Sequence, residues 1–152
     1  MKKNKQADSI ALQLITLCNG DNDLQKKAEI VKQEFNLIVE IGSRINHQSQ
    51  LMLNKVLHST RAMDTSMRTI LELFGAMPNK QYSMGSYKKK KKKGKDKCFG
   101  KLNGSLAHRI QTSVVDKRNK YLHAAGQYPT KKEAEQIVND VESYLQTILN
   151  LI

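Results

Sequence analysis

Hydrophobic residues recur along this chain of 152 residues at intervals of three and four, the period of an α-helix rather than a β-strand. A first amphipathic stretch ends at Asn19-Gly20, and glycine is the usual residue just past the end of a helix. A second and much longer pattern runs from 22 to 77 without an internal proline. The pattern therefore predicts helices as the main elements of the chain.

The pattern from 22 to 77 would give a rod of roughly 80 Å if it were one helix, at 1.5 Å per residue. A compact domain of this size cannot enclose such a rod, so we expect the segment to fold back on itself. The polar stretch 46–50 is the favoured position of the break, with 42–43 and 58–60 as alternatives. A protruding coiled coil would show the same period, so the periodicity alone leaves that alternative open.

Two further helices are expected in the last third of the chain. The final one begins after Thr130, because Glu133 follows that residue at the spacing of a capping box. The one before it begins near Ser105 and places every fourth residue on one face, namely Leu106, Ile110, Val114, Arg118 and Leu122. Together these elements predict an all-α fold, a bundle of four to five helices that forms a single domain over 1–152.

Charge adds one feature to this helical pattern. The net charge is +12, which implies a polyanionic partner or an anionic surface. Nine lysines and one aspartate fall within 88–101. Because like charges this close together repel one another, we expect 78–104 to be a flexible, disordered loop between the helices. An alternative is that the lysines only solvate this loop and form no specific site.

Other site types find little support in the sequence. Cys18 and Cys98 are too isolated to suggest a disulfide framework or a zinc site, and we expect neither a metal ion nor another cofactor. No apolar stretch approaches the roughly 18 residues that span a bilayer, so we expect no membrane segment and a cytoplasmic protein. His47, His58 and His108 show no consistent spacing with carboxylates and are assigned no chemistry.

Arg118, Asn119 and His123 are the candidate catalytic residues. Arginine offers a planar fork of donors to phosphate oxygens, and histidine exchanges protons near neutral pH. An Arg and a His at such spacings are expected by chance about 0.4 times in this composition, and requiring Asn after the Arg lowers that to about 0.03. On a helix, Arg118 and His123 lie about 140° apart, whereas Asn119 and His123 are one turn apart, so the amide can hydrogen-bond the imidazole.

The run Arg118-Asn119-x3-His123 resembles the R-x4–6-H motif of HEPN domains, small helical bundles that include metal-independent ribonucleases of toxin–antitoxin, phage-defence and CRISPR systems. The resemblance implies a homodimer whose paired motifs form a composite site, with Arg118 and His123 catalytic and Asn119 supporting them. It implies an endoribonuclease that cleaves RNA by attack of the 2′-hydroxyl, acting as a toxin or phage-defence effector. An antitoxin or a nucleotidyltransferase would be the corresponding partner. One subgroup of the family has a modifiable tyrosine two residues after the histidine, where this chain has Ala125.

On this interpretation, basic side chains near the motif and in the loop are the expected RNA contacts: Lys88, Lys89, Lys90, Lys91, Lys92, Lys93, Lys117 and Lys120. Two alternatives stay open at this point. The first is a non-catalytic RNA-binding or scaffolding protein of the same fold. Separately, the motif residues could have a purely structural role, with Arg118 paired to Asp116 or to a last-helix carboxylate such as Glu135 and His123 a helix-terminal cation. The second is a helical adaptor or antitoxin-like component that binds a protein partner.

Overall fold

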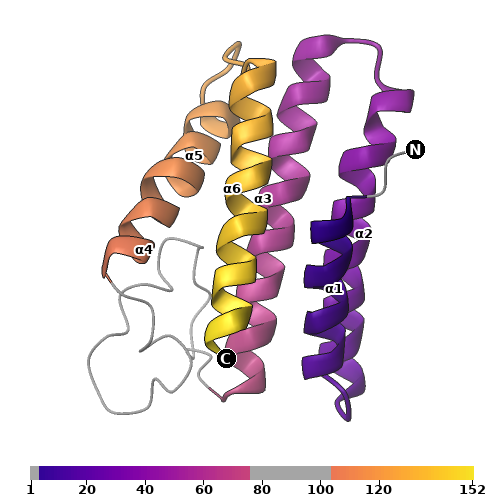
Figure 1. The fold of residues 1–152 in the computed structure, drawn as a ribbon. Helices are drawn as coiled ribbons and strands as arrows, with labels where there is room; N and C mark the ends of the chain where they lie inside the picture. Colours follow the sequence, from indigo (N-terminus) through magenta and orange to yellow (C-terminus); the bar gives the residue numbers. More distant parts are fainter. Residues whose placement is uncertain (1–3, 76–103) are drawn as a thin grey trace.

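The computed structural model describes residues 4–75 and 104–152, and all regular structure in these two ranges is helical (Figure 1). The elements in chain order are α1 (Lys5–Leu17), α2 (Asn22–Arg44), α3 (Gln48–Leu73), α4 (Gly104–Ile110), the π-helix η2 (Gln111–Val115), α5 (Asp116–His123) and α6 (Lys131–Leu151). The prediction of an all-α bundle is confirmed. The loop expected at 78–104 lies outside the described residues, except for Gly104, which begins α4.

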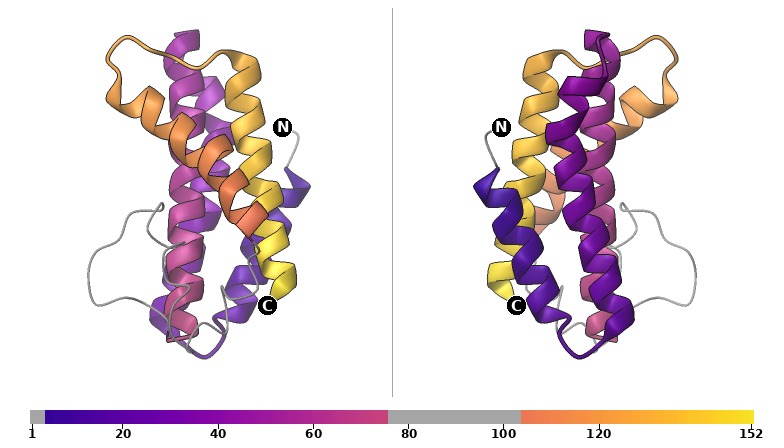
Figure 2. Two further views of the ribbon diagram at one scale, coloured as in Figure 1. Left: turned by 90° about the vertical axis from the view of Figure 1, so that its left-hand side faces the viewer. Right: turned by 90° about the vertical axis from the view of Figure 1, so that its right-hand side faces the viewer.

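The helices α3 and α6 lie side by side in the middle of the molecule. On one side of them, α2 pairs with α3, and α1 contacts both α2 and α6. On the other side, α4, η2 and α5 form one continuous helical arm that lies away from α1 and α2 (Figure 1). The arm crosses α3 and α6 obliquely (Figure 2). The helix with the candidate catalytic residues is therefore an outer element of the bundle.

The break expected in the long helical pattern separates α2 from α3. Helix α2 ends at Arg44, Ile45 has an extended backbone, and α3 begins at Gln48. This places the connection at the start of the polar stretch that was favoured for it. The predicted end of the first helix is also confirmed, because Gly20 has φ of 99°, a conformation that side chains with a Cβ rarely adopt.

Most of the core lies where α1, α2, α3 and α6 meet. Its largest fully buried side chains come from all four helices and include Ile10, Leu14, Val31, Met63, Ile70 and Leu145. A second, smaller cluster lies where the arm meets α3 and α6; its buried members are Met52, Val56, Tyr121, Ala134 and Ile137. The arm is attached through both clusters: Tyr121 of α5 belongs to the smaller one, whereas the buried residues of α4 and η2 belong to the main core, namely Leu106, Ile110, Val114 and Val115.

The π-helix corrects the expected apolar face of the arm. Val114 and the next residue, Val115, are both buried, and Tyr121 rather than Leu122 is the buried residue of α5. Arg118 and Leu122, which the four-residue spacing placed on the apolar face, are half-buried. The wider turns of the π-helix, with bonds from i to i+5, bring Val115 as well as Val114 to the buried side. Steps of four residues also drift by about 40° each around a regular helix, which carries Leu122 away from that side.

The predicted start of α6 is confirmed. Thr130 is its N-cap, with its hydroxyl accepting a hydrogen bond from the Glu133 backbone N–H at 3.2 Å. The Glu133 carboxylate accepts in return from the Thr130 backbone N–H at 2.9 Å. This capping box fixes the first turn of α6 next to the end of α5.

Candidate functional site on helix α5

All three candidate catalytic residues lie on α5, near the outer end of the arm. Arg118 and Asn119 are half-buried, and His123 is exposed in the last turn. The helix ends there because Ala124 has an extended backbone, with φ of −104° and ψ of 101°. Gly126 then takes a left-handed conformation with φ of 78°, which turns the chain toward α6.

Arg118 keeps its positive charge unneutralised within the described part of the chain. Its Nη1 donates a hydrogen bond to the neutral Asn119 Oδ1 at 3.3 Å, and no described carboxylate lies within ion-pair distance. The two acids considered as partners are engaged elsewhere. Asp116 accepts from the Gln111 side-chain amide, and Glu135 lies 4.0 Å from Lys131. The structural ion pairs proposed as the alternative role of Arg118 are therefore absent.

The expected bond between Asn119 and His123 is also absent. The Asn119 amide oxygen accepts from Arg118 instead, and the His123 ring makes no hydrogen bond to any residue in 4–75 or 104–152. The structure thus joins Arg118 to Asn119 and leaves His123 one turn further along, open to solvent. Asn119 is in a position to orient the arginine rather than the histidine.

Tyr121 is a residue that the sequence analysis missed. It is buried, and its hydroxyl donates to Glu133 Oε1 at 2.8 Å. The hydrogen bonds from the Thr130 backbone and from Tyr121 lower the pKa of Glu133 to about 2, while burial, followed by the bond to Glu133, raises the pKa of Tyr121 to about 12. The signal available in the sequence was the seven-residue spacing from Val114, which is two helical turns.

The arm and the start of α6 form the basic part of the described chain. Residues 104–132 contain six lysines and arginines and one aspartate, whereas 4–75 contain eight basic and eight acidic residues. Of the lysines expected to contact RNA, Lys117 is half-buried and Lys120 is exposed, with its ammonium 5.1 Å from the centre of the Tyr121 ring. Lys88 to Lys93 lie outside the described residues.

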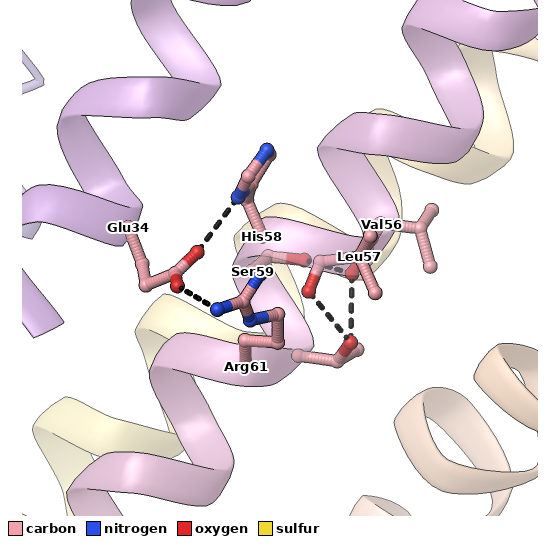
Figure 3. A network of polar contacts seen from close by, with 7 residues as sticks. Glu34, Val56, Leu57, His58, Ser59 and Arg61 are labelled. Atoms are coloured by element: carbon pink, nitrogen blue, oxygen red, sulfur yellow. Dashed lines mark hydrogen bonds and ion pairs between the residues drawn. The ribbon is translucent and has the colours of Figure 1, made fainter.

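A second polar cluster, between α2 and α3, was also missed (Figure 3). The carboxylate of Glu34 is buried. Its Oε2 lies 2.7 Å from His58 Nδ1, and its Oε1 lies 3.0 Å from Arg61 Nη2. His58 therefore has a carboxylate partner after all, 24 residues away on the neighbouring helix. The signal in the sequence was the position of Glu34 three residues after Val31, on the face of α2 that is buried.

Comparison with protein-family models, characterised proteins and solved structures found no match for this chain. Within the ranges that the structure describes, no group of three or more His, Cys, Asp or Glu side chains is arranged to hold a metal ion. No helix in those ranges is both long enough and apolar enough to cross a bilayer. The protein is therefore an all-α helical bundle with a basic outer arm. Its candidate functional residues are Arg118, Asn119 and His123 on α5.

Proposed function

We propose that this protein is a metal-independent endoribonuclease, a toxin or phage-defence effector of the cytoplasm, with Arg118 and His123 as its catalytic residues and Asn119 in support. The observation that carries the proposal is that Arg118 has no counter-ion among the described residues. Its guanidinium is half-buried on an outer helix, held by a neutral amide, and no described carboxylate cancels its charge. A half-buried cation of this kind is suited to an anionic ligand such as a phosphate.

The proposed reaction is attack of a ribose 2′-hydroxyl on the adjacent phosphorus, which leaves a 2′,3′-cyclic phosphate and a 5′-hydroxyl. His123 takes the proton from the 2′-hydroxyl or gives one to the departing 5′-oxygen, and its exposed ring is accessible for either step. Arg118 stabilises the negative charge that develops on the phosphorane oxygens. DNA lacks the 2′-hydroxyl, so RNA is the required substrate.

A homodimer would supply both proton transfers, because the same histidine of a second copy takes the role that the first leaves open. The arm is an outer element, on the opposite side of α3 and α6 from α1 and α2 (Figure 1). Two arms can therefore face each other while the α1–α2 side of each bundle stays available to an antitoxin or a nucleotidyltransferase.

The test is cleavage of a labelled single-stranded RNA in excess EDTA. The native mass of the protein in solution, which reports its oligomeric state, is measured in parallel. Wild type is expected to cut, and His123→Ala and Arg118→Ala to lose about a hundredfold or more in rate without a change in mass. The matched controls are His47→Ala and Arg44→Ala, which remove an exposed histidine and an exposed arginine at the α2–α3 connection. Cleavage by His123→Ala at the wild-type rate would exclude the proposed catalytic role.

The basic arm also favours one second candidate, a non-catalytic RNA-binding protein of the same fold. The same experiment separates the two functions. The binding function would be assigned instead if the wild-type protein binds RNA in EDTA without cleaving it and Arg118→Ala no longer binds.

A further inference from the structure

Helix α5 is attached to the bundle by one buried side chain. Tyr121 is the single buried residue among the eight of this helix. Its ring packs with Met52 and Val56 of α3 and with Ala134 and Ile137 of α6. Its hydroxyl reaches the Glu133 carboxylate at 2.8 Å.

We infer that Tyr121 is a positioning residue of the ribonuclease site, because its bond to Glu133 sets how Arg118 and His123 face RNA. The inference rests on the proposed function. Residues two apart on a helix differ by about 200° around the axis, so a Tyr121 that points into the bundle places His123 on the outer side. The observed burial agrees, with Tyr121 buried and His123 exposed.

Glu133 is a firm attachment point because it also belongs to the capping box of α6. Its Oε1 accepts from Tyr121, and its Oε2 accepts from the Thr130 backbone N–H at 2.9 Å and the Thr130 hydroxyl at 2.8 Å. One carboxylate therefore joins the last turn of α5 to the first turn of α6. The connection between the two helices turns at Gly126 and holds one backbone hydrogen bond of its own, from Gln127 N–H to the Ala124 carbonyl at 3.2 Å, so the Tyr121–Glu133 bond is the side-chain link between the two helix ends.

The structure offers a matched pair of variants that each remove donors to this carboxylate. Tyr121→Phe keeps the buried ring and removes the bond that restrains α5. Thr130→Ala weakens the cap of α6 and leaves the Tyr121 bond in place. A purely structural role of Tyr121 predicts similar effects of both on cleavage, whereas a positioning role predicts that only Tyr121→Phe lowers kcat.

The experiment measures kcat and KM for RNA cleavage in EDTA together with amide hydrogen exchange. For Tyr121→Phe we expect a loss of about ten- to a hundredfold in kcat, since small displacements of catalytic groups have effects of this size, with KM nearly unchanged. We also expect faster exchange over Asp116–His123 and wild-type exchange over the rest of α6. For Thr130→Ala we expect kcat of wild type and faster exchange only at the start of α6, because the backbone N–H of residue 130 still donates to the Glu133 carboxylate at 2.9 Å.

Exchange over Asp116–His123 that does not rise in Tyr121→Phe would overturn the inference, whether or not the protein cleaves RNA. Faster exchange with wild-type kcat would overturn it as well, because the attachment would then not position the site. Wild-type protein that fails to cleave any RNA would overturn the proposed function, and the exchange data would still decide whether Tyr121 holds α5 in place.

Discussion

Asn119 gives Arg118 a hydrogen-bond acceptor without giving it a counter-ion. The 3.3 Å bond from the guanidinium to Oδ1 restrains the arginine and leaves its charge available to a phosphate. Glu34 shows the opposite arrangement, a buried carboxylate that pairs with His58 and Arg61 across two helices. The charge of Arg118 is thus available to a ligand, whereas the charge of Glu34 is used in contacts between two helices of the fold.

Changing Asn119 to aspartate tests the role of the uncharged acceptor. Asn119→Asp places a carboxylate oxygen next to the guanidinium, so Arg118 gains an internal counter-ion and should bind and cleave RNA less well than in Asn119→Ala. We expect Asn119→Asp to be about tenfold slower than Asn119→Ala, measured as kcat/KM on the same RNA, which corresponds to about 1.4 kcal/mol. Equal rates of the two variants would show that the charge near Arg118 is unimportant.

Removing Glu34 tests how much its contacts with His58 and Arg61 stabilise the fold. Glu34→Ala leaves the nearly buried His58 ring and the exposed Arg61 guanidinium without their acceptor, so we expect a loss of about 2 kcal/mol in the free energy of unfolding, most of it from His58, measured in urea. Glu29→Ala removes an exposed carboxylate of the same helix and should change stability by less than about 0.5 kcal/mol. A loss in Glu34→Ala no larger than in this control would mean that the cluster adds nothing to stability.

At the scale of elements, the sequence predicts those helix ends that local chemistry decides. Helix α1 ends just before Gly20, as the glycine indicated. Helix α6 begins after Thr130, as the spacing of Thr130 and Glu133 indicated. The π-helix was not predicted, because its wider turns leave no distinct spacing of apolar residues. Tyr121 was missed because the face of the arm was followed in steps of four residues, which drift around a helix, and not by the seven-residue spacing from Val114. The contact of Glu34 with His58 was not predicted either, since periodicity gives the buried face of each helix but not which side chains of two helices meet.

The capping box of α6 should give a pH-dependent contribution to stability. The folded-state pKa of Glu133 is lowered to about 2 from 4.5, so its contribution is fully present above pH 4.5 and is lost as the pH falls through about 2. Glu133→Gln should therefore lower the free energy of unfolding at pH 7 by about 1 kcal/mol, the usual value of a helix cap. Urea unfolding of both proteins from pH 7 to pH 2 should show this difference shrinking below pH 4.5; a constant difference would contradict the assignment.

At the scale of the whole molecule, the positive charge is unevenly distributed. Residues 4–75, which include α1 to α3, carry equal numbers of basic and acidic residues, and the basic excess falls on the arm, the start of α6 and the lysines of 88–101. The arm lies on the opposite side of the bundle from α1 (Figure 1). Within the described residues, this asymmetry gives an anionic polymer one preferred side to approach, the side of the arm.

Salt dependence of RNA binding tests that asymmetry. Replacing Lys88 to Lys93 by serine should reduce the slope of log K against log salt by about 4 if all six lysines contact phosphates of a single strand. Replacing the exposed Lys5, Lys26 and Lys32 of α1 and α2 should leave the slope unchanged. An equal reduction per lysine in both variants would show that RNA binding follows total charge rather than its location.

The end groups of the cleaved RNA test the central claim most directly. Wild-type protein in EDTA is given an RNA oligonucleotide and a matched one with a single 2′-deoxy sugar at the mapped cleavage position. We predict products with a 2′,3′-cyclic phosphate and a 5′-hydroxyl, and no cleavage at the deoxy position, because that sugar lacks the attacking hydroxyl. Products with a 5′-phosphate, or cleavage at the deoxy position, would contradict the mechanism assigned to Arg118 and His123.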